Sequence, residues 1–333
     1  MDNSATFRLP AFGNTLKHVP GDHPLPRFIV GTSSLAPFTG DALSKNKLIM
    51  IEYDELNASI AILSTTDIDG EVQSLGFARN ESLLIVLAKN PVESFLMAYS
   101  MGIDAALTEE WRLAVDPSIL LLTHPTMDNL CLVGPGSICL VDTDAPKDMG
   151  TEIYRTDGRI RTAAWLETVP DRIVIGEGHR VIVFSLKTMK AVAQGSVEDS
   201  IALRVSPLTI DDRIYTTGTD GRLTAWASNG AGTLAPTHSD TALPHFGTAL
   251  SANTLYTSVV LVGGAYSSTV AVADVHAAGA RHLAALQMPL PEGIGVEETV
   301  WSAVDPFVAA VLGSDGTLVV GRLPGSVRGM VAA

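Results

Sequence analysis

Short apolar stretches recur along the whole chain, separated by turns rich in Gly, Pro, Asp and Asn. The clearest is residues 220–226, where an Asp-Gly turn is followed by alternating residues and ends on Trp226. Alternation of this kind predicts a half-buried β-strand. Six pairs of consecutive residues mark comparable strand ends along the chain. They are Tyr53-Asp54, Val141-Asp142, Phe184-Ser185, Trp226-Ala227, Ala273-Asp274 and Gly321-Arg322. The pattern therefore predicts an all-β protein built from a repeat.

The spacing of these strand ends identifies the kind of repeat. The intervals are about 88, 43, 42, 47 and 48 residues, close to the WD repeat of roughly 40–45 residues. The first interval holds two repeats, so a further strand is expected near residues 94–97. Seven repeats predict a seven-bladed WD40-type β-propeller. Because only 6% of the residues are aromatic, we interpret the repeats as degenerate, with Ala and Val replacing many packing aromatics.

One propeller accounts for the full 333 residues, because blades are added radially around one axis. We expect the propeller at residues 27–327 and a C-terminal tail at residues 328–333. Residues 1–26 are expected to form an N-terminal segment, whose strand at residues 5–9 completes the last blade and closes the ring. The polar segments at residues 143–159 and 231–244 are predicted to be surface loops.

Charge and hydropathy narrow the classes of partner. The 36 acidic and 22 basic residues give a net charge of -14, which argues against nucleic acid because phosphate binding needs clustered Lys and Arg. No polybasic run favours direct binding to a membrane, and apolar runs of at most about ten residues are too short to span one. The opening residues 1–5 lack the features of a signal peptide. We therefore expect a cytoplasmic protein with protein partners.

Candidates for chemistry are few. Cys131 and Cys139 lie in apolar strand-like segments and are predicted to be free, buried thiols. With no CxxC motif and no His at ligand spacing, the sequence predicts neither a metal site nor a cofactor. The paired carboxylates Glu109 and Glu110 are expected in a solvated loop. Adjacent residues on a strand point to opposite faces, so such a pair rarely provides a general acid and base.

The densest group of histidines is His238, with Asp240 beside it and His245 nearby. A WD blade often carries a His in the loop before its first strand, where it bonds to the Asp of the repeat. We favour that structural role for His238 or His245 over catalysis, which would require a nucleophile and a base within hydrogen-bonding reach.

Five residues are assigned to the structure of the blades. Asp220 and Asp315 each precede a Gly at matched positions, where an Asp side chain caps a turn. Trp226 and Trp301 are expected to pack inside the blades, and Asp305 belongs to the last blade. The sequence assigns no catalytic, cofactor or metal residue and leaves the partner-binding residues open.

Both ends of the chain resemble one family. The opening match covers residues 27–35, residues 46–55 and Gly70-Glu71-Val72. The closing match is more specific, with residues 301–307 (WSAVDPF), residues 314–320 (SDGTLVV) and Arg322-Leu323-Pro324. These strings resemble the EARP- and GARP-complex-interacting WD-repeat proteins, also called the TSSC-type family. Residues 80–289 match that family only as a degenerate propeller.

The resemblance implies a non-enzymatic adaptor that binds the GARP and EARP vesicle-tethering complexes in endosome-to-Golgi retrograde transport and endosomal recycling. It also implies a cytoplasmic protein recruited to the trans-Golgi network and endosomes. Two alternatives stay open. A WD-propeller enzyme of the diphthine methyl ester hydrolase type would need a cluster of His, Asp and a hydroxyl in the central funnel. A peptide-binding WD receptor would need a grooved, charge-complementary top face.

Overall fold

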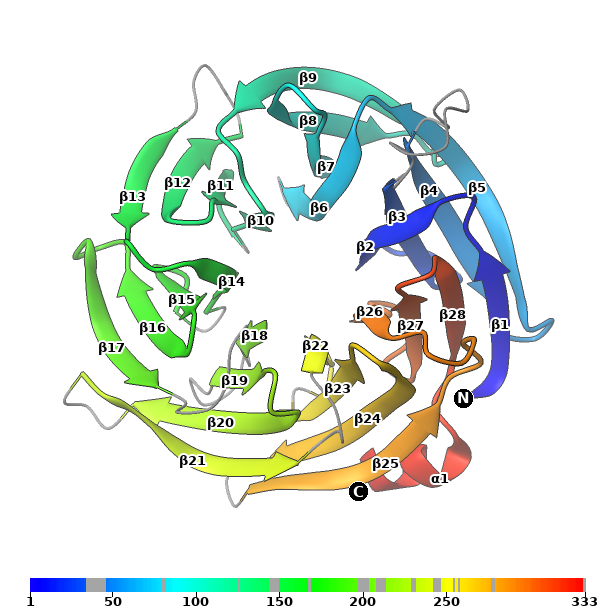
Figure 1. Ribbon diagram of the computed structural model, residues 1–333. Coiled ribbons are helices and arrows are strands. Elements are labelled where there is room, and N and C mark those ends of the chain that lie inside the picture. Colours follow the sequence, from blue (N-terminus) through cyan, green and yellow to red (C-terminus); the bar gives the residue numbers. More distant parts are fainter. Residues whose placement is uncertain are drawn as a thin grey trace.

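The computed structural model describes residues 1–33, 46–78, 82–124, 126–143, 150–166, 169–196, 204–207, 214–228, 232–241, 247–253, 255–256, 258–276 and 279–331. Their strands form seven four-stranded sheets. The sheets are arranged radially around a central axis and close into a ring (Figure 1). This arrangement confirms the predicted all-β, seven-bladed propeller.

Six blades are each built from four consecutive strands that run from the axis outward (Figure 1). Blade one consists of β2 (Phe12–His18), β3 (Arg27–Ser33), β4 (Asn46–Asp54) and β5 (Ser59–Ile68). Blade two consists of β6 (Glu71–Ala78), β7 (Leu83–Lys89), β8 (Ser94–Met101) and β9 (Leu107–Val115). Blade three consists of β10 (Leu120–Thr123), β11 (Asn129–Val133), β12 (Ser137–Asp142) and β13 (Thr151–Arg155). Blade four consists of β14 (Ile160–Trp165), β15 (Arg172–Glu177), β16 (Arg180–Ser185) and β17 (Lys190–Ser196). Blade five consists of β18 (Arg204–Pro207), β19 (Ile214–Thr217), β20 (Arg222–Ser228) and β21 (Leu234–Thr241). Blade six consists of β22 (Gly247–Ala252), β23 (Val259–Gly264), β24 (Ser267–His276) and β25 (Gly279–Gln287).

Blade seven joins the two ends of the chain. It contains β26 (Val296–Trp301), β27 (Val308–Gly313) and β28 (Thr317–Arg322), and its outer strand is β1 (Asp2–Arg8). β1 pairs antiparallel with β28, with Ala5 opposite Val320 and Arg8 opposite Thr317. The ring-closing strand expected at residues 5–9 is thus found at residues 2–8, and it pairs the edge that β28 would otherwise expose.

The third strand of each blade is the element that the sequence predicted best. All six strand ends identified from the sequence lie in the last residues of third strands, and the strand expected near residues 94–97 is β8. Several of these strands are largely buried; in β16 every residue except Arg180 is buried. Because neighbouring blades cover it on both sides, β16 is a nearly continuous apolar run, which is easy to detect in the sequence.

The boundary expected at residue 27 is wrong. β2 lies within residues 1–26, yet it is the innermost strand of blade one and pairs with β3, with Leu16 opposite Val30. β2 lines the axis and has few buried apolar residues: Leu16 is its large hydrophobic residue that is fully buried. Gly13 is needed where the strand meets blade seven, since a Cβ there would lie 2.5 Å from Leu312.

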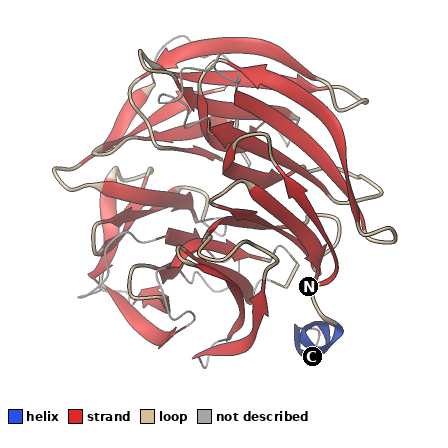
Figure 2. Cartoon of the chain, turned by 45° about the vertical axis from the view of Figure 1, so that its right-hand side comes forward, coloured by secondary structure: helices blue, strands red, loops and turns tan. Residues whose placement is uncertain are grey.

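The tail expected at residues 328–333 is also wrong in part, because α1 (Gly325–Val331) overlaps it. Figure 2 shows α1 at the edge of the strands, near the N-terminus. Its first amide, that of Gly325, donates to the Asp2 carboxylate at 3.0 Å. Val327 is buried in a cluster with Trp301 and Leu323. The segment after the last strand is therefore packed against the propeller.

The outer strands were hidden in segments predicted to be loops. β13 and β21 occupy parts of residues 143–159 and 231–244, and Glu109 and Glu110 lie in β9 rather than in a loop. An outer strand covers the blade on one side and faces water elsewhere, so it needs few apolar residues. In β13, Ile153 is the buried residue, and the alternation that marks a half-buried strand is lost.

The core is distributed around the ring as apolar clusters between neighbouring blades. Blades one and six make the same contact with the blade that follows. A Cβ on Gly31 of β3 would lie 2.4 Å from Val72, and one on Gly263 of β23 would lie 2.4 Å from Val296. The side chains of Asn14 and Thr248 donate to the carbonyls of the same two valines, at 2.7 and 2.6 Å. A glycine in the second strand thus lets the innermost strand of the following blade pack closely against it.

Because neighbouring strands in a blade are antiparallel, the turns and links that connect them lie alternately on the two faces of the disc. We call the face that carries the second-to-third turns and the links between blades the top face, and the opposite face the bottom face. No helix in the described part of the chain is long and apolar enough to cross a membrane.

Candidate functional site

Asp220 and Asp315 lie in turns of the top face, between the second and third strands of blades five and seven. Asp220 Oδ1 accepts the amide N–H of Arg222 at 3.1 Å. Asp315 Oδ1 accepts the amide N–H of Thr317 at 2.9 Å, and its Oδ2 accepts the Thr317 hydroxyl at 2.9 Å. The following glycines, Gly221 and Gly316, have φ angles of 68° and 83°. Both carboxylates therefore hold tight turns that use left-handed glycine.

Asp315 also holds the closing strand. Its carboxylate pairs with the guanidinium of Arg8, the last residue of β1. Burial alone would raise the pKa of Asp315, but the hydrogen bonds from Thr317 and Arg8 outweigh burial and hold that pKa below its ordinary value. One ionised carboxylate thus fixes the β27–β28 turn and the end of β1 together.

The two tryptophans are packing residues. Trp226 of β20 is fully buried, and its indole N–H donates to the Thr216 hydroxyl at 2.9 Å. Trp301 of β26 is 2% exposed, and its N–H donates to the Ser251 carbonyl of blade six at 3.2 Å. Because both side chains are inaccessible, neither can contact a partner directly.

Asp305 organises the β26–β27 loop of the bottom face. Ser302 Oγ accepts the amide N–H groups of Val304 and Asp305, each at 3.1 Å. Asp305 Oδ1 accepts the amide N–H of Phe307 at 2.9 Å, and its Oδ2 pairs with Arg322 Nη1 at 2.8 Å. The order Ser-x-x-Asp-x-Phe thus encodes two consecutive side-chain-capped turns.

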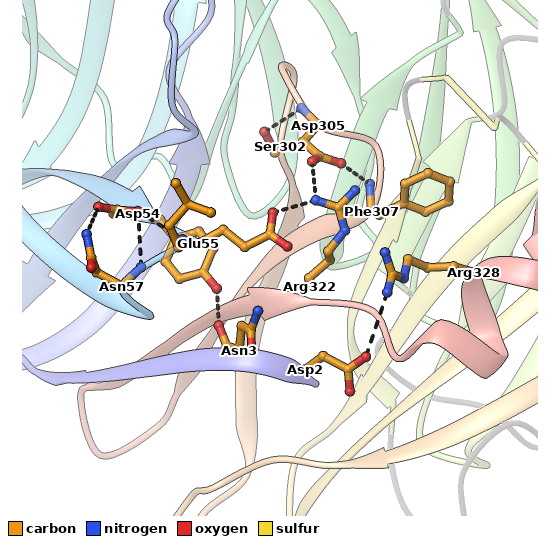
Figure 3. A network of polar contacts seen from close by, with 12 residues as sticks. Asp2, Asn3, Asp54, Glu55, Asn57, Ser302, Asp305, Phe307, Arg322 and Arg328 are labelled. Atoms are coloured by element: carbon orange, nitrogen blue, oxygen red, sulfur yellow. Dashed lines mark hydrogen bonds and ion pairs between the residues drawn. The ribbon is translucent and has the colours of Figure 1, made fainter.

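Arg322 is the centre of a polar network that joins blade seven to blade one (Figure 3). The same nitrogen that contacts Asp305 also pairs with Glu55, which lies in the β4–β5 turn. The guanidinium carbon lies 5.7 Å from the ring centre of Phe307. Close by, the Tyr53 hydroxyl donates to the carbonyl of Asn3 in β1. Burial and the nearby Glu55 raise the pKa of Tyr53 to about 12, so the hydroxyl keeps its proton.

The opening and closing sequence strings therefore meet in space. Tyr53 and Glu55 belong to the opening string, while Asp305, Phe307 and Arg322 belong to the closing one. Their side chains hold the bottom end of the ring closure, and Asp315 with Arg8 holds the top end. What these residues have in common is the joint between the first and last blades.

A second polar cluster, without any sequence motif to mark it, joins blades three and four. Glu177 is 3% exposed, and its carboxylate accepts hydrogen bonds from Thr156, Arg180 and Tyr154 at 2.6, 2.7 and 3.2 Å. Burial would raise the pKa of Glu177, but these donors lower it below the ordinary value. A Cβ on Gly158 would lie 1.7 Å from this carboxylate, so the link between the blades passes directly over it.

His124 is likewise structural and was not singled out from the sequence. Its Nδ1 accepts the amide N–H groups of Thr126 and Met127 at 3.1 and 2.9 Å, so its Nε2–H donates to the Pro170 carbonyl at 2.8 Å. Burial lowers the pKa of the imidazole, which also contacts Trp165 edge-on at 4.5 Å. This neutral ring joins a blade-three turn to blade four.

The remaining candidates are dispersed. His238 lies in the outer strand β21, opposite Ala225, and not in a loop before a first strand; His245 lies outside the described residues. Cys131 is buried and Cys139 half-buried, and both are free thiols. Burial raises the pKa of both thiols. Among the described residues, no group of three or more His, Cys, Asp or Glu could hold a metal ion.

No protein-family model matches the chain, and no curated protein matches its sequence. Solved structures do match. A chain from the crystal structure of the mitotic checkpoint complex aligns with a TM-score of 0.70 and 15% identity, over 96% of this chain and 90% of that one. The chain is a WD40-like seven-bladed β-propeller. A chain from the outer coat vertex of COPII on membranes aligns with a TM-score of 0.76 and 14% identity, over 95% of this chain and 85% of that one.

At these identities the likeness concerns the fold. WD40-like propellers are generically protein-binding scaffolds, with rigid blades that present variable loops on two faces and a rim. The five residues assigned from the sequence lie inside the blades or in the turns that shape those surfaces.

Proposed function

We propose that the protein is a non-enzymatic WD-repeat adaptor that binds a GARP or EARP vesicle-tethering complex in endosome-to-Golgi retrograde transport and endosomal recycling. The observation that carries the proposal is the contact of the two family-like strings through Glu55, Asp305 and Arg322. The two strings lie far apart in the sequence but form one joint, which favours a single match over two unrelated similarities.

Two further observations support this proposal. The two solved structures described above come from a mitotic checkpoint complex and from a COPII outer coat on membranes, and both are multiprotein assemblies. The net charge of -14 also favours a partner with a basic surface, since opposite charge speeds encounter and selects partners. On this proposal the protein is cytoplasmic and reaches the trans-Golgi network and endosomes through the complex.

The test is affinity purification of the tagged protein from its own cells, followed by mass spectrometry of the co-eluting proteins. We expect several tethering-complex subunits in similar amounts. A tagged WD40 propeller of unrelated function, expressed at the same level, is the control for non-specific recovery. If the protein is folded and expressed but recovers no more tethering subunits than the control, the proposed function is wrong.

A further inference from the structure

The outer edge of β5 differs from the edges of the other outer strands. β5 has ten residues, and the stretch from Ser59 to Thr66 is uncharged and rich in β-branched side chains. Within its sheet β5 pairs with β4 alone. It lies on the outside of the ring, next to β1 (Figure 1). Its second edge therefore has N–H and C=O groups that no described strand pairs, on a segment of high β-propensity.

Apolar side chains surround this edge. Ile62 is 51% exposed, and Ala61 and Thr65 are exposed too. Leu56, in the turn that precedes β5, is 97% exposed. Ile103 is fully exposed in the β8–β9 turn, which the Ser64 hydroxyl anchors to β5 by donating to the Ala105 carbonyl at 2.7 Å. The edge and its two flanking turns thus form one apolar strip.

Four other outer strands have features that disfavour pairing with another chain. β9 is of similar length but carries Glu109, Glu110 and Arg112, and β21 contains Pro236, which cannot donate a backbone hydrogen bond. β13 has only five residues, and β17 begins with the charged Lys190. Charges, Pro and short length are the usual protection of sheet edges, and residues 59–66 of β5 have none of them.

The charges near this edge indicate the chemistry of its occupant. Asp54 lies opposite Ser59 at the start of β5, and Asp104 follows Ile103 in the flanking turn. No ion pair joins either carboxylate to a described basic residue. Asp54 accepts hydrogen bonds from the amides of Leu56 and Asn57 and from the Asn57 side chain, which favour its charged form. A second copy of a chain with a net charge of -14 would be repelled, whereas a basic segment would be attracted.

We propose that the free edge of β5 binds an extended segment of another protein by β-strand addition, and that this segment carries alternate apolar residues with Lys or Arg near its ends. Main-chain hydrogen bonds to β5 would provide affinity, and the exposed apolar strip would select alternate side chains. The basic ends would lie beside Asp54 and Asp104. The proposal concerns the site and its chemistry, and it holds whichever complex the protein serves.

The first step of the test places a photo-crosslinking amino acid at Ile62 in the full-length protein expressed in its own cells. The control position is Met189, which has nearly the same exposure, 49%, in the β16–β17 turn. We expect an adduct from position 62 that is at least about tenfold more abundant than from position 189. The crosslinked peptide, identified by mass spectrometry, should be an extended segment with flanking Lys or Arg.

The second step measures binding of a synthetic copy of that segment to the purified protein by fluorescence anisotropy. The variant Ala61→Lys places a like charge on the edge, while Ala191→Lys makes the same change on the exposed alanine of β17. We expect about tenfold weaker binding for Ala61→Lys, since like charges at an interface are costly, and no change for Ala191→Lys. Any of four results would overturn the proposal: no excess adduct at position 62, an adduct to the chain itself, a segment without basic residues, or equal binding by both variants.

Discussion

At the scale of single residues, polar side chains in this propeller fix turns and join neighbouring blades. Asp220 and Asp315 each hold a turn of the top face through backbone N–H groups. Glu177 gathers donors from two blades. The loss of such a carboxylate leaves its backbone or side-chain donors without a partner.

The turn role of Asp220 predicts a measurable loss of stability. Asp220→Ala removes the acceptor for the Arg222 amide, so the free energy of unfolding should fall by about 1 kcal/mol. Asp157→Ala is the matched control, because Asp157 is an exposed Asp that also precedes a Gly in a top-face connection. Thermal denaturation followed by circular dichroism should show a lower Tm for Asp220→Ala alone. An unchanged Tm would contradict the turn role.

The hydrogen bonds of Asp315 predict a dependence on pH. Because its folded-state pKa lies below the ordinary value, the folded protein binds fewer protons at this site than the unfolded chain does. The stabilisation is therefore present above the unfolded pKa of about 4 and is lost as the pH falls through the lower folded pKa. The Tm difference between the wild type and Asp315→Asn should be largest at pH 6 and should shrink toward pH 3. A difference that stays constant over this range would refute the assignment.

At the scale of elements, the ring depends on the joint between blades seven and one. β1 pairs with β28 along the edge, while Arg322 spans from its own blade to Glu55 of the first. Arg322, with both acidic partners, is partly buried, whereas Arg328 of α1 makes only a 3.9 Å contact with the half-exposed Asp2. Partly buried, doubly paired charges contribute more than exposed single pairs do.

This difference predicts unequal effects of two arginine replacements. Arg322→Met leaves Glu55 and Asp305 without their shared cation and should lower the free energy of unfolding by about 1–3 kcal/mol. Arg328→Met should change it by at most about 0.5 kcal/mol. Urea denaturation of both variants at neutral pH measures the two values. If Arg328→Met proved as harmful as Arg322→Met, the pairs of Arg322 with Glu55 and Asp305 would not be the main ionic tie of the closure.

Elements differ in how far the sequence predicts them. Third strands end on recognisable residue pairs, and some of these strands, such as β16, are nearly continuous apolar runs, so their spacing revealed seven repeats. The inner strand β2 and the outer strands β13 and β21 have little or no such signal, because one faces the axis and the others face water. Burial by the ring, rather than local sequence, decides that these segments are strands.

The contacts between blades were predictable only in part. Asp305 and Asp315 could be found because they lie in strings similar to a known family, and Asp220 because Asp-Gly turns have a local signature. Glu177 and His124 had no such signature, since their partners Tyr154 and Pro170 lie more than 20 residues away in the chain. Their roles follow from the way the blades stack.

At the scale of the whole molecule, a rigid ring of blades holds two faces and a rim in fixed positions. The acidic surface favours basic partners, and binding to such partners should weaken with added salt as exposed charges are screened. The unprotected edge of β5 gives the rim a site of its own, separate from the turns of the top face that Asp220 and Asp315 hold.

The most direct test of the adaptor account is binding of the purified protein to a purified GARP or EARP complex, measured by size-exclusion chromatography with light scattering. The account predicts that the 35.1 kDa chain co-elutes with the complex and raises its mass by one or a few copies. Separate elution of the folded protein and the intact complex, with both at micromolar concentration and moderate salt, would contradict it.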